Sequence, residues 1–239
     1  MEKGVPSSSE ISEYYDDHAE RVQVAVGVNL RHRSIINRLE RAGLKPADNV
    51  LEVGCGVGMV TGLILDRVKQ GKVVGIDISD RCIRIARERF SSTGRAEFLV
   101  SDMEGLDLGR KFDFILLPDV LEHIPEEQHD RLFGTLEKHL APNGVVCIHI
   151  PDPYILDWYR KRRPEALQIV DQSLSIGTMV QRFEKHGLIL DRFERTGLWT
   201  EEPEYDWIEF RRAREPEVST RRTSWRIKMQ EWRFRLGLI

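Results

Sequence analysis

The sequence lacks the features of a membrane protein or a disulfide-rich protein. A membrane-spanning helix needs about 18 apolar residues in a row, and no apolar run in the sequence approaches that length. Residues 1–10 are polar, so no signal peptide is predicted either. The three cysteines include no Cys-x-x-Cys pair, which argues against a disulfide framework and against a zinc site. These absences predict a cytoplasmic protein without a bound metal.

A strong overall charge is also missing. The formal net charge of −3 offers no general attraction to nucleic acid. The charge is unevenly spread, because residues 211–239 contain nine Lys or Arg against three Asp or Glu. A chain of 239 residues is long enough for one large α/β domain with appendages, or for two small domains.

The most informative stretch is residues 50–58, Val-Leu-Glu-Val-Gly-Cys-Gly-Val-Gly. It predicts a buried strand that breaks into three glycines, Gly54, Gly56 and Gly58, before a helix begins at Met59. Such a unit presents backbone N–H groups at the carboxyl end of a parallel strand, where nucleotide-like ligands bind. A dinucleotide-binding loop would require a glycine at position 59, so the Gly-x-Gly-x-Gly spacing disfavours that class.

Strands and helices are predicted to alternate from this stretch to residue 150. This rhythm predicts an α/β fold with an open, mostly parallel, doubly wound sheet. The predicted strands are 50–53, 73–77, 97–100, 113–117 and 145–150, and the predicted helices are 58–69, one capped by Ser79, and 126–140.

The flanking segments follow other patterns. Two helices are predicted within residues 11–42, where they would form a lid over the carboxyl edge of the sheet. Three prolines predict irregular chain over residues 151–164. Helical pieces at 165–171 and 176–186 and two strands at 188–195 and 205–212 are predicted to follow.

Four motifs, in chain order, resemble the S-adenosylmethionine (SAM) site of class I, Rossmann-like methyltransferases. They are the glycine loop, Asp77 ending the second strand, Asp102-Met103 after the third, and Leu117-Pro118 ending the fourth. The resemblance covers residues 45–152, with a looser match to 212. It implies a seven-stranded sheet of order 3-2-1-4-5-7-6 with its last strand antiparallel. The residue pattern adds N-terminal lid helices and a C-terminal helical tail. The predicted divisions are a lid at 1–42, a SAM-binding domain at 43–212 with a substrate insertion at 151–187, and a basic amphipathic tail at 213–239.

The resemblance also implies a role for each motif. The glycine loop lets the backbone approach the methionine part of SAM, and Glu52 lies near the positively charged sulfur. Asp77 accepts hydrogen bonds from the ribose, while Asp102 and Met103 contact the adenine. The residues expected to bind SAM, or its product S-adenosylhomocysteine (SAH), are Glu52, Gly54, Cys55, Gly56, Gly58, Asp77, Ile78, Asp102, Met103, Leu117 and Pro118.

His123 is the catalytic candidate. The segment Glu-His-Ile-Pro at 122–125 is similar to that of ubiquinone-biosynthesis-like and other small-molecule methyltransferases. Its place after the fourth strand predicts that His123 lies beside the transferred methyl group, where it would act as a general base for a hydroxyl acceptor. A second interpretation, that His123 only shapes the SAM pocket, remains open.

Further residues are candidates for contact with the acceptor: Tyr14, Tyr15 and His18 on the predicted lid, Asp119 after the fourth strand, and His149, Asp152, Tyr154, Arg160 and Arg163 in or after the fifth. The basic run at 160–163 suits an anionic acceptor, and it equally suits a solvated loop. No Asn/Asp-Pro-Pro-aromatic motif follows the fourth strand, which disfavours a nucleic-acid base.

The predicted function is therefore methyl transfer from SAM to a small-molecule or glycan- or lipid-linked acceptor. O-methylation of a cell-surface saccharide precursor is the preferred reaction. The alternatives are a quinone or phenol O-methyltransferase, and a SAM- or nucleotide-binding protein without methyl transfer.

The C-terminal segment predicts an amphipathic helix. Its apolar residues recur every three or four positions, at Trp225, Met229, Trp232, Leu236 and Ile239, and Arg and Lys side chains flank them. This pattern fits an interfacial helix on an anionic membrane, which would make the protein membrane-peripheral. It also fits docking on the domain or on a second copy in a homodimer.

Overall fold

The computed structural model describes residues 8–18, 27–214 and 224–237. Within these ranges, seven strands form one sheet of order β3-β2-β1-β4-β5-β7-β6. The strands are β1 (Val50–Val53), β2 (Val73–Asp77), β3 (Ala96–Val100), β4 (Phe112–Pro118), β5 (Leu140–Pro151), β6 (Leu188–Thr196) and β7 (Tyr205–Arg212). β1 to β5 pair in parallel, and β7 is antiparallel to both of its neighbours. The predicted α/β class, strand order and antiparallel last strand are confirmed.

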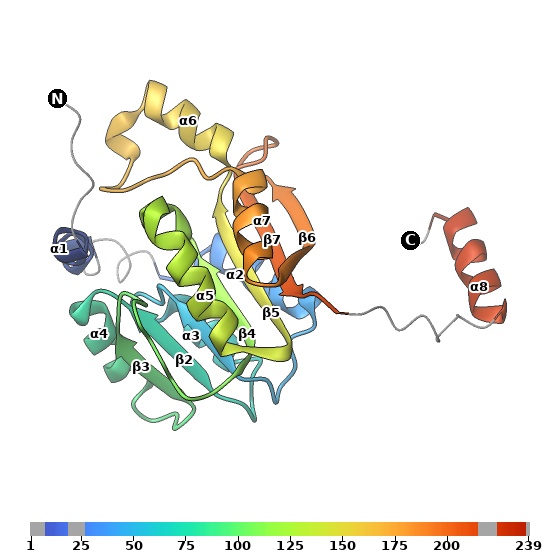
Figure 1. Cartoon of the computed structure of the whole chain (residues 1–239), viewed down its shortest axis with the longest axis horizontal. Helices are drawn as coiled ribbons and strands as arrows, with labels where there is room; N and C mark the ends of the chain where they lie inside the picture. Colours follow the sequence, from blue (N-terminus) through green and yellow to red (C-terminus); the bar gives the residue numbers. More distant parts are fainter. Residues whose placement is uncertain (1–7, 19–26, 215–223, 238–239) are drawn as a thin grey trace.

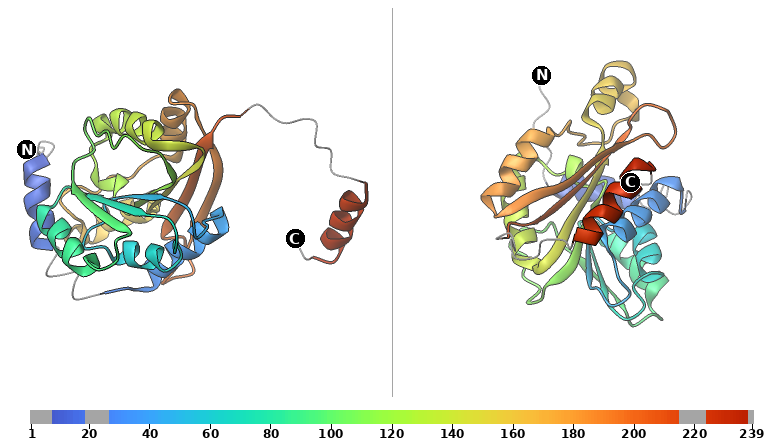
Figure 2. Two further views of the ribbon diagram at one scale, coloured as in Figure 1. Left: turned by 90° about the horizontal axis from the view of Figure 1, so that it is seen from below. Right: turned by 90° about the vertical axis from the view of Figure 1, so that its right-hand side faces the viewer.

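Helices cover both faces of this sheet (Figures 1 and 2). One face carries α2 (Leu30–Ala42), α3 (Met59–Leu65) and α4 (Asp80–Phe90), and the other carries α5 (His129–His139) and α7 (Ile176–Lys185). Beyond the carboxyl ends of the strands lie α1 (Ser8–His18), next to α4, and α6 (Pro153–Arg162). Short 3₁₀ turns are η2 (Leu121–His123), η3 (Glu126–Gln128) and η4 (Pro164–Ala166).

Cover on both faces explains the continuous apolar strands. All four residues of β1 are buried, as expected for a parallel strand between two helical layers. On one face, the rings of Phe133, Phe183 and Phe210 stack with centroid separations of 3.9 Å and join α5 and α7 to β7. Burying one such side chain contributes about 1.5–3 kcal/mol, so this stack anchors the closing hairpin to the rest of the sheet.

α2 differs from its predicted place in a lid. Its apolar stripe, Ile35, Ile36 and Leu39, packs against α3 and the sheet in the core. Its first turn, with Arg31 and His32, reaches the carboxyl edge. The lid prediction was therefore wrong for most of α2, because a helix with so continuous an apolar stripe is buried on a sheet face.

The region after β5 was also predicted incorrectly in part. Residues expected to be irregular form α6, because Pro153 stands in the first turn, where its missing N–H costs nothing, and Asp152 caps the helix. The predicted helix at 165–171 is instead the turn η4 and a loop. Both differences bear on the site, since this loop lies against the cleft.

The tail helix α8 (Ser224–Arg235) lies apart from the sheet (Figures 1 and 2). Trp225, Met229, Trp232 and Leu236 are exposed, as are Ile227 and Phe234 at other positions around the helix. Ile239 lies outside the described residues. Among the helices that are described, none is long and apolar enough to cross a membrane.

Candidate functional site

The glycine loop has left-handed backbone at each of its three glycines. The φ angles of Gly54, Gly56 and Gly58 are 72°, 52° and 80°, a region that favours glycine. A Cβ at Gly54 would lie 2.5 Å from a methyl group of Val120, and one at Gly58 would lie 2.6 Å from the ring of Phe90. Backbone conformation and packing within the chain thus require these glycines, in addition to the predicted approach of a ligand.

Asp77 connects the glycine loop to the end of β2. Its Oδ2 accepts the N–H of Gly56 at 2.7 Å, and its Oδ1 accepts the N–H of Ser79 at 2.9 Å. Ser79 in turn caps α4, as its position predicted, by accepting the N–H of Cys82. A carboxylate is therefore held at the carboxyl edge, between the loop and the start of the next helix.

Two adjoining cavities lie at this edge. The larger, of about 250 Å³, is lined by Glu52, Gly54, Cys55, Gly56, Asp77 and Pro118 from the expected SAM set, together with Tyr15, Asp119 and His123. The smaller, of about 80 Å³, is lined by Ile78, Asp102 and Met103 and by apolar residues that include Ile11, Val53 and Ile76. The four residues Tyr15, Gly54, Val120 and His123 line both cavities, which are therefore continuous parts of one site.

The lining fits SAM. The smaller cavity offers an apolar slot beside a carboxylate, which suits an adenine ring with its exocyclic amine. In the larger, burial, with a further contribution from the Asp77 charge, raises the pKa of Glu52 to about 8, although the Thr61 hydroxyl donates to its carboxylate. A cationic ligand would favour the ionised form of Glu52. SAM bound here would supply a methyl group already activated by its sulfonium centre.

Two residues of the expected SAM set do not line either cavity. Gly58 caps α3 and contacts Phe90, and the Leu117 side chain lies in the core. The Asp102 side chain accepts the N–H of Glu104 at 3.0 Å, and Met103 has a left-handed φ of 70°. The individual roles of these residues toward SAM remain predictions.

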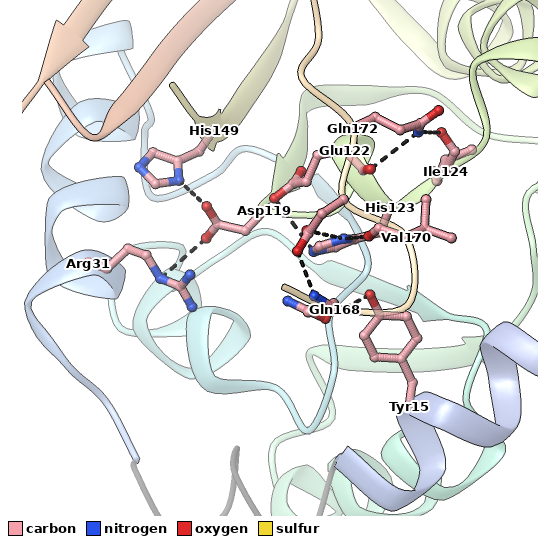
Figure 3. A network of polar contacts seen from close by, with 11 residues as sticks. Tyr15, Arg31, Asp119, Glu122, His123, Ile124, His149, Gln168, Val170 and Gln172 are labelled. Carbon is pink, nitrogen blue, oxygen red and sulfur yellow. Dashed lines mark hydrogen bonds and ion pairs between the residues drawn. The ribbon is translucent and has the colours of Figure 1, made fainter. Parts of the chain in front are cut away.

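His123 is fixed by its neighbours (Figure 3). Its Nδ1 lies 2.5 Å from the carbonyl oxygen of Val170 and 3.1 Å from Oδ1 of Asp171, and its Nε2 lies 3.6 Å from Oε1 of Glu122. Among the described residues, Oε2 of Glu122 has no hydrogen-bond partner despite its burial. The loop after η4, which was predicted to be helical, therefore supplies two of these partners of His123, Val170 and Asp171.

These contacts oppose the predicted role of His123 as a general base. Burial alone would lower the pKa of His123, but the Glu122 carboxylate and the contacts with Asp171 and Val170 raise it to about 9. At neutral pH the ring is therefore protonated, and its Nδ1–H donates to the Val170 carbonyl. A base must be unprotonated to accept a proton, so the geometry favours the second interpretation, in which His123 shapes the pocket.

Asp119 is the centre of a second cluster (Figure 3). Its Oδ1 is 2.6 Å from Nδ1 of His149, and its Oδ2 is 3.4 Å from Nε of Arg31. Although burial opposes its ionisation, the charges of Arg31 and His149 lower the pKa of Asp119 to about 2. Asp119 also has a left-handed φ of 55°. Backbone strain of this kind, at a residue whose side chain has two ionic partners, is typical of a functional site.

Sequence reasoning missed several residues that line the larger cavity: Asn29, Arg31, His32, Met59 and Gln168. Asn29 caps α2, and its N–H donates to Nδ1 of His32, which leaves the proton of the neutral ring on Nε2. Burial and the charge of Arg31 lower the pKa of His32 to about 4, so this ring is neutral near pH 7. The Asn-x-x-His capping box is the signal that would have identified the start of α2.

The predicted acceptor residues divide into two groups. Tyr15 lines both cavities, and its hydroxyl donates to Oε1 of Gln168 at 3.0 Å. Asp119 also lines the cleft. The side chain of His18 is outside the described set.

Tyr14, His149, Asp152, Tyr154, Arg160 and Arg163 do not line the cleft. Asp152 caps α6 and pairs with Arg195 at 2.6 Å. Arg160 binds Asp157, Ser173 and the carbonyl of Asp171. Asp152, Arg160 and Arg163 were expected to form the acceptor pocket, but none of them lines either cavity. Asp152 and Arg160 instead hold α6 in place.

Comparison with known proteins identifies the fold and a family that part of the chain resembles. Residues 50–144 match a family model described as a methyltransferase domain. A magnesium protoporphyrin IX methyltransferase from Synechocystis PCC 6803, solved with bound SAH, superposes with a TM-score of 0.68 at 19% identity and covers 86% of this chain and 99% of its own. The fold is therefore that of class I, Rossmann-like methyltransferases, and residues 50–144 resemble a methyltransferase domain.

The similar proteins of known sequence are small-molecule or carrier-linked methyltransferases by name. A trans-aconitate 2-methyltransferase of Azoarcus sp. (strain BH72) is 32% identical over 124 residues, which are 52% of this chain and 47% of that protein. A malonyl-[acyl-carrier protein] O-methyltransferase of Acetivibrio thermocellus is 38% identical over 102 residues, 41% of this chain and 34% of that protein. The chain thus spans about half, or less, of the length of these curated relatives.

Proposed function

We propose that the protein is an enzyme that transfers the methyl group of SAM to an oxygen atom of a small-molecule acceptor. The observation that carries this proposal is the composition of one continuous site. One end has the glycine loop, Asp77 and the apolar slot at Asp102 and Met103, and the other end has polar side chains that the cofactor set does not include. A cofactor and a second, polar ligand can therefore lie in contact, and holding two reactants in line is the main requirement of methyl transfer.

The choice of acceptor depends on the polar end. A saccharide precursor was expected because of Arg160 and Arg163, and neither residue lines the cleft. The names of the relatives mention trans-aconitate and a malonyl carrier, which are acids. Acidic acceptors are therefore favoured over saccharides and phenols.

A methyl-donor assay tests the proposed function. The full chain is incubated with SAM labelled in its methyl group and with a panel of nucleotide sugars, phenols and carboxylic acids. Acceptor-dependent transfer of the label, with release of SAH, is expected. Tight SAM binding with no transfer to any acceptor would favour the alternative of a SAM-binding protein without activity.

A further inference from the structure

The polar end of the cleft is rich in hydrogen-bond donors. The Arg31 side chain is 32% exposed, pairs with Asp119 through Nε and also forms a hydrogen bond with the Tyr205 side chain. Its two terminal nitrogens lie on the side away from the Asp119 carboxylate (Figure 3). The neutral ring of His32 carries its proton on Nε2, and Gln168, whose Oε1 accepts the Tyr15 hydroxyl, has amide hydrogens to donate. A guanidinium and two neutral N–H donors suit a planar anion with two oxygen atoms.

Among the residues that the structure describes, the same end lacks an effective base. The titratable groups that line the larger cavity are Tyr15, Arg31, His32, Glu52, Cys55, Asp77, Asp119 and His123. His123 is protonated and bound to Val170, Asp119 is paired with Arg31 and His149, and the low pKa of His32 makes it a weak proton acceptor. Burial raises the pKa values of Tyr15 and Cys55, and Glu52 and Asp77 lie on the side assigned to the cofactor. Within the described part of the chain, a hydroxyl acceptor would therefore find no group well suited to take its proton.

We propose that the acceptor is a small carboxylic acid, methylated on a carboxylate oxygen, and that Arg31 binds its anionic end. This inference rests on the proposed function and specifies its substrate class. A carboxylate is already ionised near pH 7, so it needs no base. One carboxylate oxygen forms a bond to the methyl carbon as the carbon–sulfur bond breaks, the bonding pair remains on sulfur, and no proton is transferred. The products are a methyl ester and SAH.

SAM carries a carboxylate of its own, so a carboxylate bound by Arg31 belongs either to the cofactor or to the acceptor. Protein saturated with SAH separates them, because the cofactor carboxylate is then already present. Calorimetric titration of this complex with succinate, citrate and aconitate, and with succinamide as a neutral counterpart, measures binding of the acceptor alone. We expect saturable binding of at least one carboxylate, and binding of the amide weaker by roughly tenfold or more.

Matched variants test the role of Arg31. Arg31→Gln should weaken carboxylate binding to the SAH complex by roughly tenfold or more, with SAH affinity nearly unchanged. Arg33→Gln is the control, because Arg33 is on the same helix, exposed, and does not line the cleft. A loss of SAH affinity with unchanged carboxylate binding would assign Arg31 to the cofactor and overturn its place in the acceptor site.

The chemistry of the product decides the substrate class. A methyl ester releases methanol in mild alkali, whereas a methyl ether does not. An alkali-stable product formed on phenols or sugars, or no carboxylate binding to the SAH complex, would overturn the carboxylate proposal and leave the proposed function standing. Failure of the protein to bind either SAM or SAH would instead overturn the proposed function itself.

Discussion

The side chains of the cleft gain their properties from burial and from their partners. His123, Asp119 and His32 are ordinary titratable residues whose pKa values move in different directions, to about 9, about 2 and about 4. Near pH 7 the first two are therefore charged and the third is neutral. Fixed protonation states suit a site that binds and orients an ionised acceptor, since none of these groups has to exchange a proton during the reaction.

The protonation of His123 gives a testable pH dependence. We expect its ring, observed by NMR in histidine-labelled protein, to remain protonated through pH 8 and to titrate near pH 9. Glu122→Gln should lower this pKa, because the Glu122 carboxylate is the largest influence that raises it. Titration near the ordinary value of 6.5 in the wild-type protein would contradict the assignment and restore His123 as a candidate base.

The same shift predicts the sign of a stability change. The folded protein holds the His123 proton at pH values where the unfolded chain releases it. This contribution to stability is complete below pH 6.5 and is lost as the pH rises toward 9. Burial raises the pKa of Glu122 from 4.5 to about 7, so the stability that its proton contributes is likewise lost as the pH rises, between pH 4.5 and about pH 7. Denaturant unfolding should therefore show a lower free energy of unfolding at pH 9 than at pH 6.

Among the elements, the loop between β1 and α3 depends on packing as much as on ligand binding. We expect Gly58→Ala to destabilise the fold by about 1–3 kcal/mol, because it places a side chain at a left-handed φ and moves a Cβ to within 2.6 Å of Phe90. Gly105→Ala is a matched control with a φ of 65° and no atom within 4 Å of the added Cβ. Denaturant unfolding compares the two, and an equal cost for both would show that contact with Phe90 contributes nothing.

The elements also show what the sequence was able to predict. Strands such as β2, at 73–77, and the cap at Ser79 were predicted because apolar runs and capping residues act locally. The cofactor end of the site followed from motifs that end consecutive parallel strands. The acceptor end did not, because Arg31 and Gln168 reach the cleft through tertiary packing of α2 and of the loop after η4, which leaves no local pattern. The prediction of irregular chain around Pro153 was wrong for a related reason. A proline indicates a helix break unless it is known to lie in the first turn of a helix.

At the scale of the whole molecule, helices cover both faces of the sheet, and α8 lies apart from it (Figures 1 and 2). Trp225 and Trp232 of α8 are exposed. Contact of α8 with an anionic membrane, or with a second copy of the chain, therefore stays a prediction. Cosedimentation with anionic vesicles and light scattering distinguish these two partners.

Removal of the tail should not affect the site. We expect a chain that ends at Arg214 to bind SAH with an affinity within about twofold of the full chain, because no residue of α8 lines the cavities at the carboxyl edge. Calorimetry measures both forms. A large loss of affinity in a truncated protein that retains its circular dichroism would place the tail at the active site.

The central claim is that the site at the carboxyl edge binds SAM through the glycine loop and Asp77. Calorimetry of the full chain with SAM, SAH and NAD tests this claim most directly. We expect one binding site per chain for SAM and SAH, none for NAD, and a loss of affinity of roughly tenfold or more in Asp77→Ala. Asp80→Ala, at an exposed acidic residue three positions on that pairs with Arg84, should bind both ligands normally. Binding of NAD without SAM or SAH would contradict a SAM site at this edge, and unchanged SAM affinity in Asp77→Ala would contradict the role of Asp77.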